Sequence, residues 1–276
     1  SVVREVCKAS RDPATCEASL SSQTQSGDVL GALETAVGVS SENRDLGRGM
    51  VQEILDSSAD DFNRSRAASL CIQLLGYSAY RADSAAGALS RREIKDARAW
   101  MSAALAYHYD CWSGLKYVND SAQVGKAMAF FNDTVIKSTA DALAMIANYD
   151  NFGEETGSWS PTKTERDGFW PTATESSGAG FVGGIPAGLK PDLTVCKGGC
   201  DYSTVQEAVN ASPDNLPAGN RFVIWIKSGV YEETVRVPFQ KRNLVFLGDG
   251  MGNTIITGSG NVGQPGVTTY NTATVG

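Results

Sequence analysis

The chain has 276 residues, of which 42% are apolar, and it carries a formal net charge of −7. This length allows one or two domains with a buried core. The acidic balance argues against a nucleic-acid partner, because no basic face is available to displace phosphate counterions. No apolar run reaches the roughly 18 residues that a transmembrane helix needs, so we expect no membrane anchor. The chain opens SVVREVC, without a charged and apolar leader, and we expect any signal peptide to have been removed.

Six cysteines and a single histidine, His108, limit the redox and metal chemistry. The cysteines are Cys7, Cys16, Cys71, Cys111, Cys196 and Cys200. Buried free thiols and a metal site are alternatives to disulfides, but zinc needs about four nitrogen or sulfur ligands and only one histidine is present. N-x-S/T sequons, typical of a secreted glycoprotein, stand at Asn63, Asn119, Asn132 and Asn210. We therefore predict disulfides, an oxidising compartment and no metal site.

Residues 1–150 show helical periodicity almost throughout. Two short helical pieces are expected in residues 1–22, on either side of Asp12-Pro13. Breaks between the longer helices are expected at Ser26-Gly27, at Ser57-Ser58 and, as N-cap regions, at Gly87–Ser90 and Asn119–Ser121. Long helices joined by short loops predict an all-α, up-down four-helix bundle preceded by a helical hairpin.

The cysteine positions and several sequence motifs of this helical half are typical of one protein family. They are Cys7 and Cys16 close together, Cys71 near a helix start, DARAW…SAAL…DC ending at Cys111, and STADALAMI (Ser138–Ile146). Over about residues 1–150 the chain thereby resembles the plant pectin methylesterase and invertase inhibitor family. That family pairs its first two cysteines and its last two, which implies the disulfides Cys7–Cys16 and Cys71–Cys111. The resemblance also implies a bundle that docks across a pectinesterase cleft.

Residues 151–190 have a different composition, in which Gly, Ser, Thr and Pro recur with little periodicity. This composition predicts a linker. Trp159, Phe169 and Trp170 are unusual in a free linker, and we favour their packing on a neighbouring domain over a recognition motif. The basic pairs Arg91-Arg92 and Lys241-Arg242 both lie outside this segment.

Residues 191–276 contain short β-branched and aromatic runs between Gly, Asn and Asp turns, at Phe222–Lys227, Leu244–Leu247 and Thr254–Thr257. The runs are apolar along their length, as expected for parallel strands stacked into a coil. Parallel coils need several repeats to bury a continuous core, and only about two or three are present here. We therefore expect an incomplete β domain.

Five sequence motifs follow one another in this segment. They are TVQEAV (Thr204–Val209), IKSGVYEETV (Ile226–Val235), NLVFLGDG (Asn243–Gly250), TIITG (Thr254–Gly258) and TTYNTATVG (Thr268–Gly276). Across roughly residues 191–276 they resemble the opening of a plant pectin methylesterase. The resemblance implies a right-handed parallel β-helix and a secreted cell-wall (apoplast) enzyme that demethylesterifies homogalacturonan (pectin) without a cofactor.

The family's catalytic aspartates, glutamines and arginine lie beyond Gly276, so we predict no catalytic residue within the chain. An inhibitor-like region followed by a pectinesterase segment is the usual order in plant pectinesterase precursors. Many of those carry a basic processing motif in the linker, and this linker lacks one. Proteolytic release of the first region is therefore not predicted.

No substitute for those catalytic residues is expected elsewhere. We interpret His108 as a structural helix residue rather than as the base of a Ser-His-Asp site with Asp110. A G-x-S-x-G nucleophile motif does not occur. Glu232 and Glu233 are adjacent on a predicted strand and should point to opposite faces. Asp249, between two glycines, is interpreted as a turn residue.

Thr269, in TTYNTATV, is the candidate substrate-binding residue. The resemblance implies that its hydroxyl contacts substrate, and the alternative is a strand threonine favoured for its β-propensity. Gly229 and Tyr231 are expected to serve a turn and a core contact. The short spacing of Cys196-Lys-Gly-Gly-Cys200 favours a local disulfide over a redox site. The alternative is that one or both of these cysteines stay free.

Hypotheses of different classes remain for function. The first is a pectinesterase whose residues 1–150 act as a tethered autoinhibitor or folding partner, with a passive solubility or targeting role as the alternative for that region. The second is an inhibitor or binding protein for pectinesterase or invertase. The third is a structural β-helical wall protein. Under every hypothesis the isolated chain is predicted to be inactive as an esterase.

Overall fold

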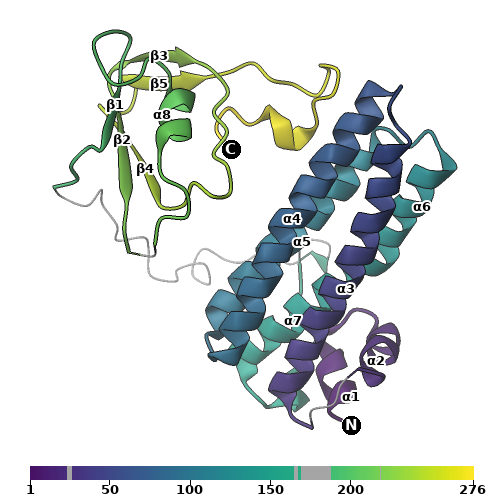
Figure 1. Cartoon of the computed structure of the whole chain (residues 1–276). Coiled ribbons are helices and arrows are strands. Elements are labelled where there is room, and N and C mark those ends of the chain that lie inside the picture. Colours follow the sequence, from purple (N-terminus) through teal and green to yellow (C-terminus); the bar gives the residue numbers. More distant parts are fainter. Residues whose placement is uncertain (24–26, 165–166, 169–187, 218) are drawn as a thin grey trace. The chain divides into compact units, whose positions relative to one another are not determined.

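A computed structural model describes residues 1–23, 27–164, 167–168, 188–217 and 219–276 of the chain (Figure 1). The chain divides into two compact units, Ser1–Trp170 and Pro171–Gly276. Helices build the described part of the first unit. Short strands build the described part of the second, together with one helix after the first strand and a 3₁₀ helix after the last. This order agrees with a helical region followed by part of a strand domain.

The helical unit opens with the two short pieces predicted on either side of Asp12-Pro13. The elements are α1 (Val2–Val6), the 3₁₀ helix η1 (Cys7–Ala9), α2 (Pro13–Ser21), α3 (Val29–Asp56), α4 (Phe62–Ser90), α5 (Ile94–Lys116), α6 (Ala122–Phe130), the π-helical turn η2 (Phe131–Val135), α7 (Ile136–Phe152) and the 3₁₀ helix η3 (Thr156–Ser158). A side-chain cap starts α2, since the Asp12 carboxylate accepts a hydrogen bond from the Thr15 amide at 3.2 Å. Pro13 takes the first helical position, where its missing N–H costs nothing.

The long helices α3, α4, α5 and α7 share one core. Helix α4 packs against α3 and α5, and α7 packs against α3 and α5. Side-chain caps also start α3, α4 and α6, where the N-cap residues are Asp28, Asp61 and Ser121. Such caps satisfy amide groups that have no partner inside the helix.

The N-cap predicted at Gly87–Ser90 is wrong. Helix α4 continues through these residues to Ser90, and α5 begins only at Ile94, where Glu93 makes no capping bond through its side chain. Ala88 and Leu89 are fully buried, and their burial offsets the low helix propensity of Gly87. The chain turns instead at Arg92, whose φ of 60° lies in the left-handed region.

A π-helical turn joins α6 to α7 and places Phe131 and Val135 in the core. Both side chains lie against Gly47 of α3. A Cβ atom added to Gly47 would come within 3.0 Å of the Phe131 ring and 3.3 Å of Val135. Glycine is therefore needed here because the helices approach closely.

The segment after α7 folds back on the helical unit. Trp159 is 4% exposed and packs in the same core as α1 and α3. Asn148 and Ser160 exchange hydrogen bonds of 3.0 and 3.1 Å, and Arg11 binds Asp167 at 2.6 Å. Trp159 thus packs on the helices that precede it, in line with the predicted packing on a folded domain, whereas Phe169 and Trp170 lie outside the described residues. The limits of the linker, predicted as 151–190, stay a prediction.

The second unit contains two parallel sheets. Its elements are β1 (Leu193–Val195), α8 (Val205–Ala211), β2 (Phe222–Ile226), β3 (Gly229–Glu232), β4 (Leu244–Gly248), β5 (Thr254–Thr257) and the 3₁₀ helix η5 (Thr269–Thr272). The first sheet has the order β1-β2-β4, and β3 pairs with β5 in the second. The predicted parallel strands over residues 222–227, 244–247 and 254–257 are confirmed, with bounds shifted by one residue at most.

Apolar side chains from β1, β2, β3 and α8 fill the core of this unit. Ile224 and Tyr231 are fully buried, and Val205 and Val209 of α8 pack with them. Helix α8 begins with a capping box, in which the Thr204 hydroxyl accepts from the Glu207 amide and the Glu207 carboxylate accepts from the Thr204 amide. The TVQEAV block therefore encodes a capped helix that packs against β1 and β2.

Candidate functional site

Thr269 is the residue for which the sequence predicted a substrate contact. It is exposed and begins η5, so the alternative interpretation as a strand residue is wrong. The local cause is Asn271, whose side-chain oxygen accepts hydrogen bonds from the Thr268 amide at 3.4 Å and the Thr268 hydroxyl at 2.9 Å. This reciprocal capping favours a turn over an extended chain.

Arg236 holds the Thr269 segment in place, and the sequence analysis did not identify it. Its guanidinium donates to the carbonyl oxygens of Ala273 at 2.7 Å and Asn271 at 2.6 Å. Next to it, Val235 forms a parallel bridge with Val275. An arginine in the loop after β3 gives no sequence signal for this role, because the partners are backbone carbonyls about 35 residues away.

Two of the candidate carboxylates in the strand unit, those of Glu233 and Asp249, have hydrogen-bonding partners within the fold. Glu233 accepts from the amides of Val205 and Gln206, both at 2.9 Å, at the start of α8. Glu232 closes β3 and is exposed. Asp249 accepts a hydrogen bond from the Trp225 indole N–H at 2.7 Å. This bond is the main cause that holds the pKa of Asp249 below its usual range. The structure does not bring these carboxylates together as an acid–base set.

His108 belongs to a buried polar cluster built by four helices. Its Nε2 lies 2.6 Å from the Ser78 hydroxyl, and its Nδ1 lies 3.1 Å from the Thr139 hydroxyl, which in turn lies 2.7 Å from the Ser40 hydroxyl. Because the single Thr139 proton is donated to the Val135 carbonyl at 2.7 Å, Nδ1 donates and Nε2 accepts. Burial lowers the pKa of His108 to about 3, so the ring is neutral. With all members nearly inaccessible, this cluster offers no site for an ester.

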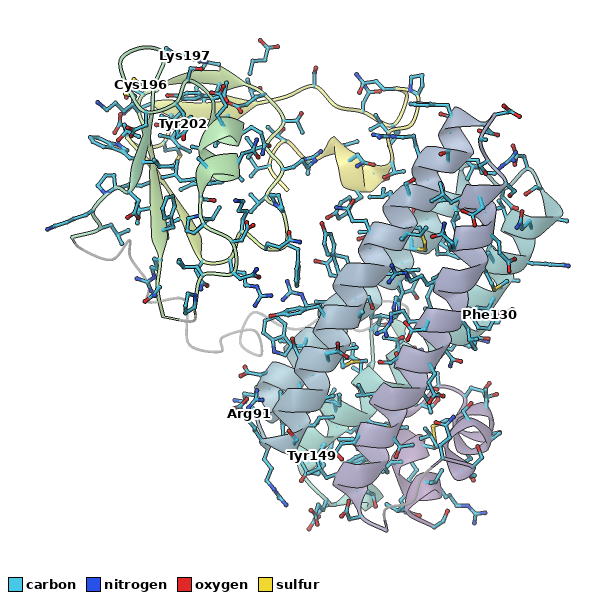
Figure 2. The ribbon with its side chains drawn as sticks, viewed as in Figure 1. Arg91, Phe130, Tyr149, Cys196, Lys197 and Tyr202 are labelled. Carbon is cyan, nitrogen blue, oxygen red and sulfur yellow. A yellow bond between two sulfur atoms is a disulfide. The ribbon has the colours of Figure 1, made fainter. Side chains whose placement is uncertain are left out.

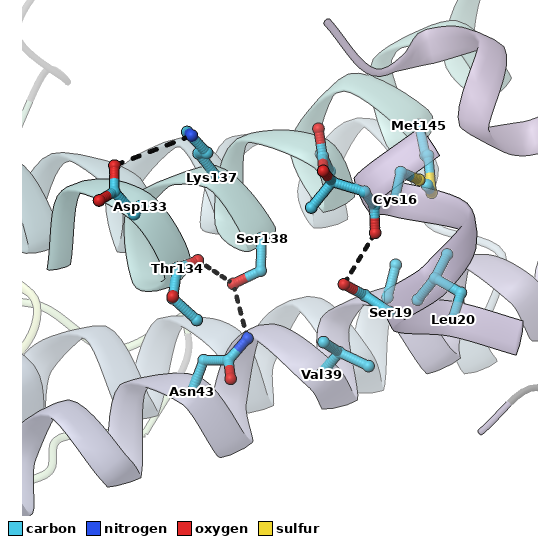
Figure 3. Close-up of a pocket in the computed structure, with 13 residues that line it drawn as sticks. Cys16, Ser19, Leu20, Val39, Asn43, Asp133, Thr134, Lys137, Ser138 and Met145 are labelled. Carbon is cyan, nitrogen blue, oxygen red and sulfur yellow. Dashed lines mark hydrogen bonds and ion pairs between the residues drawn. The ribbon is translucent and has the colours of Figure 1, made fainter. Parts of the chain in front are cut away.

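A small pocket of about 140 Å³ opens between α2, α3 and α7 (Figure 3). Leu20, Val39 and Met145 supply apolar walls, and Asn43 and Ser138 bond each other at 3.1 Å on the polar side. Figure 3 also shows the Lys137–Asp133 ion pair at the rim, with 3.8 Å between the charged atoms. Asp141 lines the same pocket, and it accepts a hydrogen bond from the Ser10 hydroxyl at 2.6 Å. Burial is the main cause that raises the pKa of Asp141 to about 6.

The six cysteines form three disulfides: Cys7–Cys16, Cys71–Cys111 and Cys196–Cys200. The third closes the loop after β1, where Figure 2 labels Cys196, Lys197 and Tyr202. The Lys197 ammonium lies 4.5 Å from the Tyr231 ring centroid, and the Cys196 amide donates to the Tyr202 carbonyl at 3.1 Å. These contacts give the loop a structural role.

All four sequon asparagines, Asn63, Asn119, Asn132 and Asn210, are exposed. Their glycosylation stays a prediction. Among the described residues, no three His, Cys, Asp or Glu side chains gather as a metal site would require, and no helix has the length and apolar character to span a bilayer.

Comparison with known protein families assigns both units to described classes. Residues 1–145, more than half of the chain, match the model for plant invertase/pectin methylesterase inhibitors. Residues 192–276 match the pectinesterase model. The chain therefore belongs to the plant invertase/pectin methylesterase inhibitor family, and it joins an inhibitor domain to a pectinesterase segment.

Individual relatives combine the same two parts. The chain is 50% identical to the probable pectinesterase/pectinesterase inhibitor 64 of Arabidopsis thaliana, over 99% of this chain and 47% of that protein. It is 34% identical to the pectinesterase/pectinesterase inhibitor U1 of Solanum lycopersicum, over 67% of this chain and 32% of that protein. The chain thus spans less than half the length of these relatives.

Solved structures match parts of the chain. A pectin methylesterase from carrot matches with 50% sequence identity and a TM-score of 0.30, over 33% of this chain and 28% of that one. A mutant form of a pectin methylesterase inhibitor from Arabidopsis matches with 16% identity and a TM-score of 0.46, over 53% of this chain and 96% of that one.

Proposed function

We propose that this chain is the N-terminal part of a plant pectinesterase that removes methyl esters from homogalacturonan, with the helical unit as its inhibitor-like region. The observation that carries the proposal is the 50% identity to a probable pectinesterase/pectinesterase inhibitor through both units, without a change in their order. In fold terms, we propose an up-down four-helix bundle with an N-terminal hairpin, followed by the first coils of a right-handed parallel β-helix. The contacts of α3, α4, α5 and α7 and the parallel pairing of β1, β2 and β4 support this architecture.

The substrate contact that we propose within this chain is the Thr269 hydroxyl. It is exposed, and Arg236 fixes the segment that carries it, so a sugar oxygen could be bound without rearrangement of the fold. The three disulfides and the exposed sequons support a secreted, cell-wall location. Pectin and a pectinesterase domain, in the same or another molecule, are the proposed partners.

The purified chain of 276 residues should release no methanol from highly methylated pectin. Ester hydrolysis needs a nucleophile, an acid–base group and an oxyanion donor around one carbonyl, and the described residues do not bring such a set together. Methanol is measured by gas chromatography against a heat-inactivated sample, with a second preparation from a different host to exclude a contaminating esterase. Release that follows the concentration of this chain in both preparations would contradict the proposal.

The helical unit is proposed to restrain the esterase domain or to assist its folding. A tethered inhibitor acts at an effective concentration that reaches the millimolar range for short linkers, so even weak affinity would keep a cleft covered. The test is to delete residues 1–168 from the complete enzyme and measure kcat and KM on pectin. The deletion ends after Asp167 because residues such as Trp159 and Ser160 pack on the helical unit.

Two outcomes support this role. Either turnover rises on deletion and falls again when residues 1–168 are added in trans, or the yield of soluble enzyme drops and refolding improves again when residues 1–168 are added in trans. A passive solubility role predicts lower yield without any effect of the added helical unit on turnover or on refolding. Unchanged turnover together with unchanged yield would rule out the proposed role of the helical unit but would not affect the esterase assignment.

A further inference from the structure

The first helices of the chain form a self-contained hairpin that sits on the rest of the helical unit. We define the N-terminal hairpin as residues 1–21, with α1, η1 and α2 closed on each other by the Cys7–Cys16 disulfide. Val6, Cys7 and Leu20 are almost fully buried against the core that α3 and α7 share. Because the disulfide lies inside the hairpin, it does not fasten the hairpin to α3 or α7.

The seam beneath the hairpin is incompletely packed. The pocket of about 140 Å³ lies in this seam, with Thr15, Cys16, Ser19 and Leu20 on the hairpin side. Cavities of this kind reduce the packing contacts that hold two elements together. Opening the seam therefore costs less here than it would between fully interlocked helices.

A half-buried carboxyl group, that of Asp141, crosses the same seam. Asp141 of α7 accepts from the Ser10 hydroxyl at 2.6 Å, and Ser10, which is 1% exposed, accepts from the Asp12 amide at 2.9 Å. Asp12 is also the N-cap of α2, so Asp141 is linked through one serine to the start of that helix. We propose that this seam is a pH-sensitive joint, at which ionisation of Asp141 loosens the N-terminal hairpin from α7.

The groups around Asp141 determine whether its ionisation strengthens or weakens docking of the hairpin. Burial opposes its ionised form and is the main cause of the raised pKa, about 6 against an ordinary value of 3.8. Asp12 on the hairpin side raises the pKa further, whereas the Ser10 hydroxyl and Lys137 of α7 lower it. On α3 the pocket presents the neutral side chains of Ala36, Val39 and Asn43. Asp133 is already paired with Lys137 at the rim.

Linkage then fixes the pH window. A carboxyl whose pKa is raised in the docked state stabilises docking fully below about pH 4, and this contribution is lost as the pH rises through about 6. Between about pH 4.5 and pH 7.5 the docking equilibrium should weaken by about 10- to 30-fold, where the lower figure allows for the partial exposure of Asp141. The pKa of Asp12 is lowered, chiefly by its hydrogen bond with Thr15, so Asp12 titrates below this window. Its ionisation stabilises the docked hairpin, which is the opposite of the effect expected for Asp141.

Hydrogen exchange of the whole chain tests the proposal. Protection factors of the α2 amides, corrected for the pH dependence of intrinsic exchange, should fall by about 10- to 30-fold from pH 4.5 to pH 7.5. In Asp141→Asn, which keeps an acceptor for Ser10 but cannot ionise, the fall should shrink to less than about 3-fold. The matched control is Asp133→Asn, in the π-helical turn η2 just before α7 and at the same pocket, which should behave as the wild type. Amides of α4, away from the seam, report any global change.

Two results would overturn the proposal. One is a pH profile of the α2 amides in Asp141→Asn that matches the wild type, and the other is the absence of any fall in the wild type. Should Asp141→Asn fail to fold, a carbon-13 NMR titration of the Asp141 carboxyl in the wild-type chain decides the question. A midpoint near the ordinary value of 3.8 would contradict the joint.

Discussion

Replacing Cys71 and Cys111 together with alanine is expected to lower the free energy of unfolding of the helical unit by about 4 kcal/mol. The disulfide joins α4 to α5 across a sequence separation of 40 residues, and removing it gives that loop its full freedom in the unfolded chain. Alanine is chosen because both cysteines are almost fully buried, where a serine hydroxyl would need a new partner. Urea denaturation followed by far-ultraviolet circular dichroism reports the helices.

The other disulfides provide graded controls for this loss. Removing Cys196–Cys200, with a separation of 4 residues and in the other unit, should leave the helical transition unchanged. Removing Cys7–Cys16, with a separation of 9, should cost about 3 kcal/mol by the same loop-closure argument. Non-reducing peptide mapping of the wild type must precede the series. A crossed pair, such as Cys111 with Cys196, or a loss below about 1 kcal/mol for the Cys71–Cys111 pair, would contradict the expectation.

Tyr231→Ala should destabilise the strand unit by about 3–5 kcal/mol, enough to unfold it if its stability is near the lower end for small domains. The ring is fully buried at the centre of the core, and the hydroxyl donates to the Lys227 carbonyl at 2.9 Å. Truncation therefore leaves a cavity and also removes the donor from that carbonyl. Hydrogen exchange of the β2 and β4 amides in the whole chain measures the effect on this unit alone.

Two substitutions separate packing from hydrogen bonding at this position. Tyr231→Phe keeps the ring and should cost only about 1 kcal/mol. Val230→Ala changes the neighbouring residue on the opposite face of β3, which is 56% exposed, and should stay within about 0.5 kcal/mol of the wild type. Equal losses for Tyr231→Ala and Val230→Ala would show that Tyr231 is not a core residue in solution.

Local signals in the sequence located most elements of the fold. Asp12-Pro13 starts α2 and Ser121 caps α6, because a short polar side chain before a helical run has one favourable conformation. The prediction failed at Gly87–Ser90, where burial of Leu89 overrides the propensity of a glycine. Tertiary context of this kind is not visible in a window of a few residues.

The candidate sites show the same limit more sharply. Thr269 was identified only through a family resemblance, and its turn depends on the side chain of Asn271. Asp141 was missed altogether, since nothing in STADALAMI indicates that its carboxyl meets Ser10 from the start of the chain. Contacts between residues that are distant in sequence create both environments, so periodicity and motif could not predict them.

The parallel strands have a consequence for synthesis. Their spatial order follows their order in the chain, with β1 beside β2, β2 beside β4, and β3 beside β5. β2, β4 and β5 each find a partner that has already been translated, whereas β3 stays without a strand partner until β5 has been made. Because translation adds roughly 5–20 residues per second, one strand after another can join its sheet at intervals on the order of a few seconds. The strand segment is thus suited to vectorial folding while the polypeptide is still being made.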